Sequence, residues 1–417
     1  MVHQLPLGAR DLLPLDVTQK LWIERRLQQV FHRWGYHQII TSTLERLDTL
    51  MAGGAVQPST VIQLLNTEDE GLGLRPELTA SIARTVVTRM AGTNWWPQRL
   101  YYNANVFRKG GKINYGGQQE FYQAGVELLG AGGLRADVEI LLLLLECLQG
   151  LELNHCHLIL GEAGLTRSLL SVFPEPLQEA VREAIANLDR ITLETLPMSP
   201  ELRERALFLF DLRGQPEEVL SQVAQLDLDA EQQQALNNLK SLIDLLQNCY
   251  SARTEQQTIK VSPPSIVLDL SLIQTFDYYT GIVFTVVSNS PSGSRILAQG
   301  GRYDQLLKLY HPQGKAEPGI GFSFNIEDLH QVLLGMNQLP QEVSSSDWLV
   351  VPETPQAYAA AFAYAEKLRE STQLVRVEME LGHREEKENL RDYARRRGIH
   401  QIAWVNEEGI PQIETLK

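Results

Sequence analysis

Polar residues that could bind a small charged molecule lie in three separate stretches of this 417-residue chain. Glu77 and Thr79 stand two residues apart, and a carboxylate with a hydroxyl is a suitable partner for an ammonium group. Glu127, Tyr278 and Tyr279 could bond both nitrogens of an imidazole ring, one with a carboxylate and the other with a phenol. These residue types favour recognition of an amino-acid-sized polar molecule.

A predicted hairpin positions part of this set. Residues 99–108 are rich in β-forming side chains, residues 109–117 form a glycine-rich loop, and residues 119–129 return as a second strand. Arg108 ends the first strand, and Gln123 on the second offers an amide donor to a carboxylate. The hairpin therefore brings Arg108, Gln123 and Glu127 onto one structural unit.

An amphipathic helix precedes the hairpin. Asp16 can cap its start, with Gln19 at capping-box spacing. Apolar residues then recur at helical intervals over residues 23–34 and define one buried stripe. Gly35 follows, where a helix end often needs a left-handed residue, and residues 36–40 are predicted as a strand.

Further elements follow the hairpin. Residues 138–148 are apolar nearly all round and predict a buried helix. Residues 158–160, 266–270 and 282–287 read as strands. Residues 178–248 are rich in Leu, Gln and Glu with helical periodicity, which predicts a helical insertion with solvated faces.

The last part of the chain has a different predicted pattern of helices and strands from the part before it. Residues 342–346 read as a linker. After it, strands are predicted over residues 348–351, 375–379 and 401–405, and helices over residues 356–370 and 387–397. This alternation of strands and helices favours a small α/β domain with a mostly parallel sheet.

Composition limits the class of protein. Hydrophobic residues make up 43% and charged residues 21%, as in ordinary globular proteins. The net charge of −14 disfavours broad binding of polyanions such as nucleic acids. Three cysteines without CxxC spacing, no signal-peptide pattern and no long apolar run lead us to expect a cytoplasmic protein without a membrane segment.

The order of these elements resembles the antiparallel catalytic domain of class II aminoacyl-tRNA synthetases, and the histidyl-tRNA synthetase family most closely. Gly8-Ala9-Arg10-Asp11-Leu12-Leu13-Pro14 is similar to that family's N-terminal signature, and residues 74–80 are similar to its Arg-Pro-Glu-x-Thr-Ala element. Phe107-Arg108 resembles the motif 2 arginine. Gln123-Ala124-Gly125-Val126-Glu127 resembles the substrate-reading strand, and Asp277-Tyr278-Tyr279-Thr280-Gly281 resembles the histidine loop.

The resemblance covers roughly residues 3–335 and implies an α+β fold. It implies a synthetase-like antiparallel sheet flanked by helices over residues 1–335, with the helical insertion at about residues 178–248. Residues 346–417 would form a small C-terminal α/β domain that resembles a shortened anticodon-binding domain.

The resemblance also implies a ligand. In the family the matching residues contact histidine, so the expected histidine-binding residues are Glu77, Thr79, Arg108, Gln123, Glu127, Tyr278 and Tyr279. A site that bonds both imidazole nitrogens rejects isosteres, because its buried polar groups would be left unpaired. No catalytic residue, metal or cofactor is expected.

Two departures argue against catalysis. The family's histidine-loop arginine aligns with Gln274, and its motif 3 arginine aligns with Asp328. Transfer at the α-phosphate of ATP needs cations aimed at the developing charge, and losing one such donor costs about 2.7–4 kcal/mol. An aspartate at position 328 is expected to repel a phosphate. An amino-acid site without a working nucleotide site predicts a sensor.

This pattern resembles the regulatory subunits of ATP phosphoribosyltransferase, which are paralogues of histidyl-tRNA synthetase. The resemblance implies a non-catalytic subunit that binds histidine as a feedback effector in the first step of histidine biosynthesis. Its partner would be a short-form catalytic subunit in a hetero-oligomer, and tRNA is not expected to bind. Many such paralogues lack the C-terminal domain altogether.

Two other hypotheses remain open from sequence. A working histidyl-tRNA synthetase would activate histidine with ATP and charge tRNA, and Gln274 and Asp328 argue against it. A paralogue that ligates histidine to another acceptor, or binds an RNA regulator, would retain exchange without tRNA charging.

Simpler interpretations exist for single motifs. Glu77 and Thr79 alone could be a capping pair, and Tyr278 and Tyr279 alone could be ordinary sheet residues. The glycine loop 109–117 is expected to be a hairpin tip, since it lacks the ending of a phosphate-binding loop.

Two further clusters, one of possible metal ligands and one of arginines, also have simple interpretations. His155-Cys156-His157 has too few neighbouring ligands for structural zinc. The arginines of residues 391–397 are expected to form a solvated helix face paired with Glu385, Glu386 and Glu388.

Overall fold

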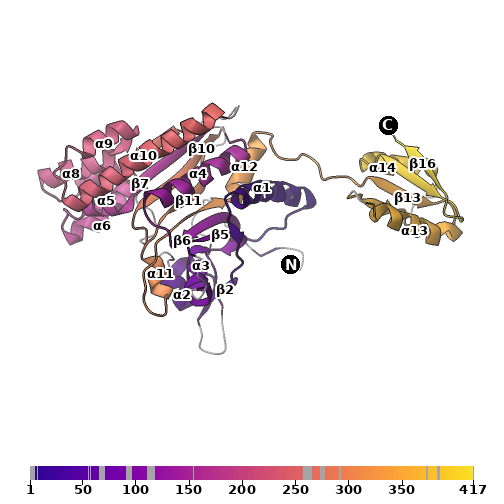
Figure 1. The fold of residues 1–417 in the computed structure, drawn as a ribbon, viewed down its shortest axis with the longest axis horizontal. Helices are drawn as coiled ribbons and strands as arrows, with labels where there is room; N and C mark the ends of the chain where they lie inside the picture. The colour runs from indigo at the N-terminus through magenta and orange to yellow at the C-terminus, as the bar shows by residue number, and fades with distance from the viewer. Residues whose placement is uncertain are drawn as a thin grey trace. The chain divides into compact units, whose positions relative to one another are not determined.

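The chain forms two compact units, Met1–Leu339 and Pro340–Lys417, each with its own core (Figure 1). The computed structural model describes residues 5–6, 8–54, 56, 58–64, 71–90, 96–109, 118–153, 155–256, 265–272, 278–290, 293–371, 374–382 and 386–416.

A large sheet organises the first unit. Its nine described strands lie in the order β1 (His37–Gln38), β5 (Gln98–Phe107), β6 (Glu120–Leu129), β12 (Gly319–Asn325), β11 (Gly293–Arg302), β10 (Ile282–Ser290), β7 (Cys156–Glu162), β9 (Ser265–Asp269) and β8 (Arg213–Gly214). Neighbouring strands are antiparallel except in the pairs β1–β5 and β7–β9. The sheet brings strands from distant parts of the sequence into contact.

Three helices cover one face of this sheet: α1 (Pro14–Arg33), α4 (Leu134–Gly150) and α12 (Ile326–Gly335) (Figure 1). Val126 and Leu128 of β6 point into the core beneath these helices. Because side chains alternate along a strand, Glu127 points to the opposite face. That opposite face carries the candidate site.

Smaller elements border the opposite face. They are β2 (Leu44–Arg46), β3 (Gln63–Leu64), β4 (Leu72–Leu74), α2 (Leu47–Met51), α3 (Thr79–Thr85) with a π-helical turn (Val86–Met90), and α11 (Leu306–Tyr310). Ile82 and Val86 pack with Tyr102 of β5 and with Tyr303 in a second core cluster. This cluster fixes the start of α3 against the sheet.

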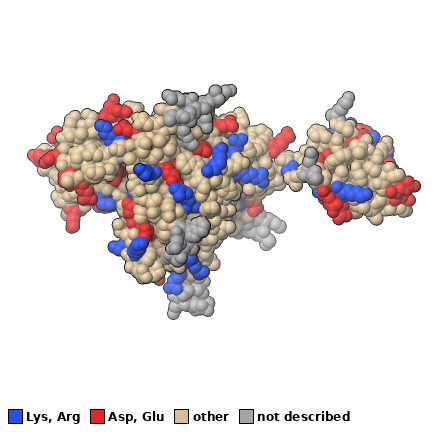
Figure 2. Space-filling model, viewed as in Figure 1, with Lys and Arg blue, Asp and Glu red and all other residues tan. Residues whose placement is uncertain are grey.

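A helical subregion packs beside α4. It comprises α5 (Ala163–Leu170), α6 (Glu175–Ala186), α7 (Arg190–Thr195), α8 (Pro200–Asp211), α9 (Pro216–Val223) and α10 (Ala230–Gln256). Leu239, Leu242 and Leu246 of α10 are buried in the same core as α4. Acidic side chains are frequent on its outer surface (Figure 2), as expected for solvated helix faces.

The second unit is a four-stranded sheet with helices. Its elements are β13 (Trp348–Pro352), α13 (Tyr358–Arg369), β14 (Val377–Met379), α14 (Lys387–Arg396), β15 (Gln401–Val405) and β16 (Pro411–Thr415). The order is β14-β13-β15-β16, with β13 parallel to both of its neighbours and β16 antiparallel to β15.

The predicted α+β class is confirmed, while several element boundaries were wrong. Helix α1 begins at Pro14, because proline suits the first helical position, and Asp16 lies inside the helix, where it accepts the Leu13 N–H at 2.9 Å. The strand expected over residues 36–40 is limited to His37–Gln38. Strands β11, β12 and β16 were not predicted, because glycines in the first two and proline in the third weaken the sequence signal.

A buried ion pair links α4 to the end of β11. Arg302 donates to Asp137 from two nitrogens, one of them at 2.9 Å from the carboxylate, and it contacts Asp304 at 3.1 Å. Both Arg302 and Asp137 are less than a tenth exposed. Breaking such a pair leaves a buried charge without its main partner.

Replacing Asp137 with alanine should therefore lower the free energy of unfolding of the first unit by about 3 kcal/mol. Urea denaturation followed by circular dichroism would measure the change. Asp211→Ala is the control, since Asp211 forms an exposed pair with Arg190 and its loss should shift the midpoint far less. Equal shifts in the two variants would contradict the assigned role of the Arg302–Asp137 pair.

Candidate ligand-binding cavity

A cavity of about 370 Å³ lies between the start of α3 and strands β5, β6, β11 and β12. Its size suits a ligand at the small end of the usual range for binding pockets. The structure brings all seven residues predicted for the site to its wall: Glu77, Thr79, Arg108, Gln123, Glu127, Tyr278 and Tyr279. They come from three distant stretches of the sequence, so the sheet order assembles the cavity.

Glu127 is the most deeply buried of these residues, with 2% of its surface exposed. The Thr79 hydroxyl donates to one carboxylate oxygen at 2.8 Å, and the Tyr303 hydroxyl donates to the other. Gly321 is its register partner on β12, and a Cβ at that position would lie 2.0 Å from a Glu127 oxygen. Only glycine leaves room for this carboxylate.

Burial controls the charge of Glu127. Loss of water raises its pKa to about 8, and the nearby Glu77 charge adds to the rise. The hydrogen bonds from Tyr303 and Thr79 oppose this shift but do not cancel it. In the empty cavity Glu127 is therefore largely protonated at neutral pH, and a bound cation would favour its charged form.

Glu77 serves two purposes at the cavity wall. Its carboxylate accepts the backbone N–H groups of Thr79 at 2.6 Å and Ala80 at 2.9 Å, so it caps the start of α3. Burial raises its pKa, while these hydrogen bonds and the charge of Arg108 lower it. The simple interpretation of Glu77 and Thr79 as a strand-edge capping pair does not hold, since the Glu77 carboxylate binds the start of a helix, and it also faces the cavity.

The two arginines of the predicted motifs have different surroundings. Arg75 is buried and donates to the carbonyl groups of Thr41 and Asn105 at 2.9 and 3.0 Å, which ties β4 to neighbouring segments. Arg108 donates to the Pro76 carbonyl at 2.8 Å and also lines the cavity. Arg108 therefore presents a guanidinium at the cavity wall.

Four tyrosines of the described part of the chain line the cavity, and two of them were not predicted. Burial raises the pKa of Tyr102, Tyr278, Tyr279 and Tyr303, so their phenols stay neutral and can donate hydrogen bonds. The Tyr278 ring lies perpendicular to that of Tyr303, with centroids 5.6 Å apart. Tyr102 lies on β5 and Tyr303 directly follows β11, and the sequence pattern pointed to neither residue as part of the site.

Asp328 has a partner that the sequence did not predict. Its side chain is buried and forms an ion pair with Arg295 at 3.1 Å, and it is absent from the described cavity wall. Its charge is therefore compensated within the protein. Gln274, Asp277 and residues 110–117 lie outside the described part of the chain.

The His155-Cys156-His157 cluster does not gather further ligands. Cys156 is buried, and the His157 ring contacts the Ser265 hydroxyl. Among the described residues no group of three His, Cys, Asp or Glu side chains is arranged to hold a metal ion. No described helix has both the length and the apolar character needed to cross a bilayer.

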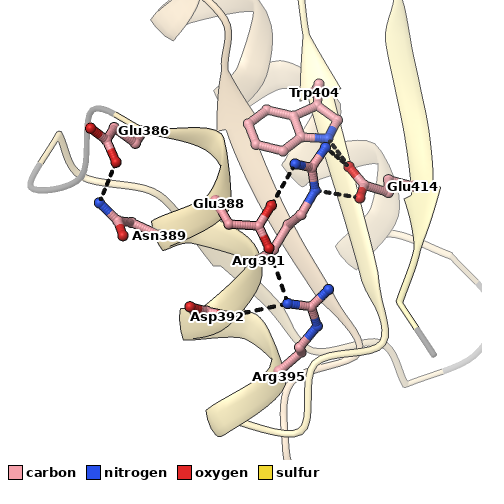
Figure 3. Close-up of polar contacts among 8 residues, drawn as sticks. All are labelled: Glu386, Glu388, Asn389, Arg391, Asp392, Arg395, Trp404 and Glu414. Carbon is pink, nitrogen blue, oxygen red and sulfur yellow. Dashed lines mark hydrogen bonds and ion pairs between the residues drawn. The ribbon is translucent and has the colours of Figure 1, made fainter.

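The arginines of α14 are largely paired within the second unit (Figure 3). Arg391 contacts Glu414 at 2.6 Å and Glu388 at 3.0 Å, and Arg395 contacts Asp392 at 3.0 Å. Of the expected partners, Glu388 is used, Glu386 accepts from Asn389, and Glu385 lies outside the described residues. These ion pairs compensate part of the positive charge of α14 within the second unit.

Comparisons with known proteins agree with this architecture. The family model for histidyl-tRNA synthetase matches residues 8–329. An ATP phosphoribosyltransferase regulatory subunit from Nostoc punctiforme is 63% identical over 417 residues, which covers 100% of both chains. The chain belongs to the family of ATP phosphoribosyltransferase regulatory subunits.

Solved structures place this family within the synthetase-like fold. A crystal structure described as an ATP phosphoribosyltransferase regulatory subunit/histidyl-tRNA synthetase from Bacillus halodurans superimposes with a TM-score of 0.76 at 25% identity, covering 94% of this chain and 97% of that one. A histidyl-tRNA synthetase from Nostoc sp. PCC 7120 gives a TM-score of 0.76 at 19% identity, covering 99% and 97%. The second similarity concerns the fold alone.

The raised pKa of Glu127 predicts a pH dependence of stability. Its folded-state pKa of about 8 exceeds the ordinary value of 4.5, so the folded chain binds more protons than the unfolded chain between these values. The contribution of Glu127 is therefore fully present below pH 4.5 and is lost as pH rises towards 8. On the order of 3 kcal/mol should be lost by pH 7.

Glu127→Gln should flatten this part of the pH profile, which urea titrations between pH 5 and 8 would measure in the absence of ligand. Glu120→Gln, on the same strand but outside the cavity wall, is the matched control and should keep the wild-type slope. Parallel profiles for Glu127→Gln and the wild type would refute the assignment.

Proposed function

We propose that this chain binds histidine as the feedback effector of an ATP phosphoribosyltransferase. The observation that carries the proposal is a buried glutamate, Glu127, at an amino-acid-sized cavity that also holds Arg108. The site thus combines a guanidinium with a buried carboxyl group that a bound cation would shift to its charged form, which suits a zwitterion with a basic side chain.

Each group of histidine has a suitable partner. The imidazole would bond Glu127 and one of the tyrosine hydroxyls. Because the Thr79 hydroxyl already donates to Glu127, its lone pairs can accept from the ligand ammonium, together with Glu77. Arg108 and Gln123 would hold the ligand carboxylate.

The partner in this proposal is a short-form catalytic subunit, joined to this chain in a cytoplasmic hetero-oligomer. That subunit would carry out the first step of histidine biosynthesis and would require this chain for activity. Histidine can shift the assembly only by binding its active and inactive states with different affinity. In this proposal histidine binds in the cavity of this chain, and the activity that changes is that of the catalytic partner.

We propose further that the chain itself does not activate histidine. Gln274 carries no charge, and Asp328 is an acid whose charge is paired with Arg295. Neither residue can replace a cation beside a triphosphate. Sensing requires no metal or cofactor.

The domain assignment is part of the proposal. Residues 1–335 would be the histidyl-tRNA synthetase-like core, and residues 346–417 a shortened anticodon-binding domain. The internal pairing of Arg391 and Arg395 supports a second unit that does not bind tRNA.

Histidine activation is the second candidate function. Arg108 and Lys109 both line the cavity, so two cations stand near the place where a nucleotide would react. This candidate predicts exchange of pyrophosphate with ATP that depends on histidine.

Glu127→Ala should abolish the feedback. Loss of a hydrogen-bonded carboxylate should weaken histidine binding by about 10- to 100-fold, which calorimetry would measure. The variant should still co-purify with the catalytic subunit, whose activity should no longer respond to histidine. Glu120→Ala, on the same strand outside the cavity wall, is the control. Feedback that persists in Glu127→Ala would place the effector site elsewhere.

A direct assay distinguishes histidine activation from the proposed regulatory function. The purified chain should show no pyrophosphate exchange with ATP and histidine, whereas adding it to the catalytic subunit should raise phosphoribosyl transfer. Exchange at the rate of a charging enzyme would overturn the proposal in favour of a synthetase. A catalytic subunit that is fully active alone and unaffected by this chain would also overturn it.

A further inference from the structure

Residues 278–281 contribute to the walls of two cavities. Tyr278 and Tyr279 line the ligand-binding cavity described above. Thr280 and Gly281 line a second cavity of about 880 Å³, whose other walls come mainly from α4, α5 and α10. The backbone that carries two ligand-facing phenols is thus also exposed to the helical subregion.

The backbone of this segment is held from two sides. From α5, the Arg167 guanidinium donates to the Tyr279 carbonyl at 3.0 Å, and the Ala163 N–H donates to the Gly281 carbonyl at 2.9 Å. From the end of β11, the Arg302 carbonyl accepts the Thr280 N–H at 2.8 Å. The sheet side is fixed by the buried Arg302–Asp137 pair, whereas the other side depends on where α5 lies.

Helix α5 is in turn attached to the helical subregion. Glu162 is buried and accepts the Leu165 N–H at the start of the helix. Ser168 accepts a hydrogen bond from Gln232 of α10 at 2.9 Å. A continuous series of contacts therefore runs from Tyr279 through Arg167 and α5 to the start of α10.

Arg167 is the one side chain in this series that reaches the segment from the helix. A guanidinium bonded to a carbonyl is a charge-assisted hydrogen bond, which is stronger and more directional than a neutral one. The second cavity lies beside Arg167 and α5, and it leaves space into which the helix can shift. A displacement of α5 would then move the Tyr279 backbone and both phenols.

We propose that Arg167 is a positioning residue, which holds the Tyr278 and Tyr279 phenols in place and couples occupancy of the ligand cavity to helices α5 and α10. The inference rests on the proposed function only in taking histidine as the ligand. The positioning itself is a property of the empty protein. Regulation of this kind needs an element that both sites bias, and α5 is that element.

The first test uses the full chain without ligand. In Arg167→Met, hydrogen exchange of peptides that cover residues 278–282 should be faster than in the wild type. Arg203→Met is the matched control, because Arg203 also donates to a carbonyl in the helical subregion, that of Leu196 at 3.1 Å. Unchanged exchange of residues 278–282 in Arg167→Met would overturn the proposal, whether or not histidine binds.

The second test uses histidine as the probe. Arg167→Met should weaken histidine binding by about three- to tenfold, the loss of one hydrogen bond, and Arg167→Lys should recover part of the affinity. A purely structural contact would lower the melting temperature in both Met variants and leave the affinity of both unchanged. Wild-type affinity in Arg167→Met would therefore overturn the positioning role.

The coupling is tested in the same samples. Histidine should slow exchange of residues 163–170 in the wild type and in Arg203→Met, but not in Arg167→Met. If α5 does not respond to histidine in a wild-type protein that binds it, the coupling is overturned. If the wild type binds no histidine, the proposed function and the coupling both fail, and the ligand-free exchange still decides whether Arg167 positions the segment.

Discussion

Burial of the Glu127 carboxylate is the constraint on which the site depends. Placing an acid where 2% of its surface is exposed is unfavourable unless hydrogen bonds or a countercharge compensate it. Thr79 and Tyr303 supply the hydrogen bonds, and the raised pKa shows that the compensation is incomplete. In the empty cavity this carboxyl group is therefore largely protonated at neutral pH, and a positive charge placed beside it would favour its charged form.

The surrounding sheet is built to permit this burial. Gly321 lies opposite Glu127 and Gly319 lies against the Tyr303 ring, where a Cβ would come within 2.3 Å of a ring carbon. Both glycines are in β12, which was not predicted from the sequence because glycine is unfavourable in strands. The feature that weakened the sequence signal is the one that makes room for the ligand-facing side chains.

The fold alone does not separate a synthetase from a regulator, since both share it in the comparisons. Asp328 shows why a substitution has to be seen in its surroundings: the sequence suggested a repulsive acid, whereas Arg295 neutralises it away from the cavity wall.

The sequence by itself determined the local helices and strands and the chemical types of the residues at the site. Helical periodicity identified α1, α4 and the helical subregion, the glycine loop identified the β5–β6 hairpin, and the seven predicted residues all reach one cavity. Only the tertiary structure decided that Tyr303 meets Glu127, that Arg295 pairs with Asp328, and that Arg167 holds the Tyr279 backbone. These contacts depend on strand order and register between distant segments, and no local periodicity encodes them.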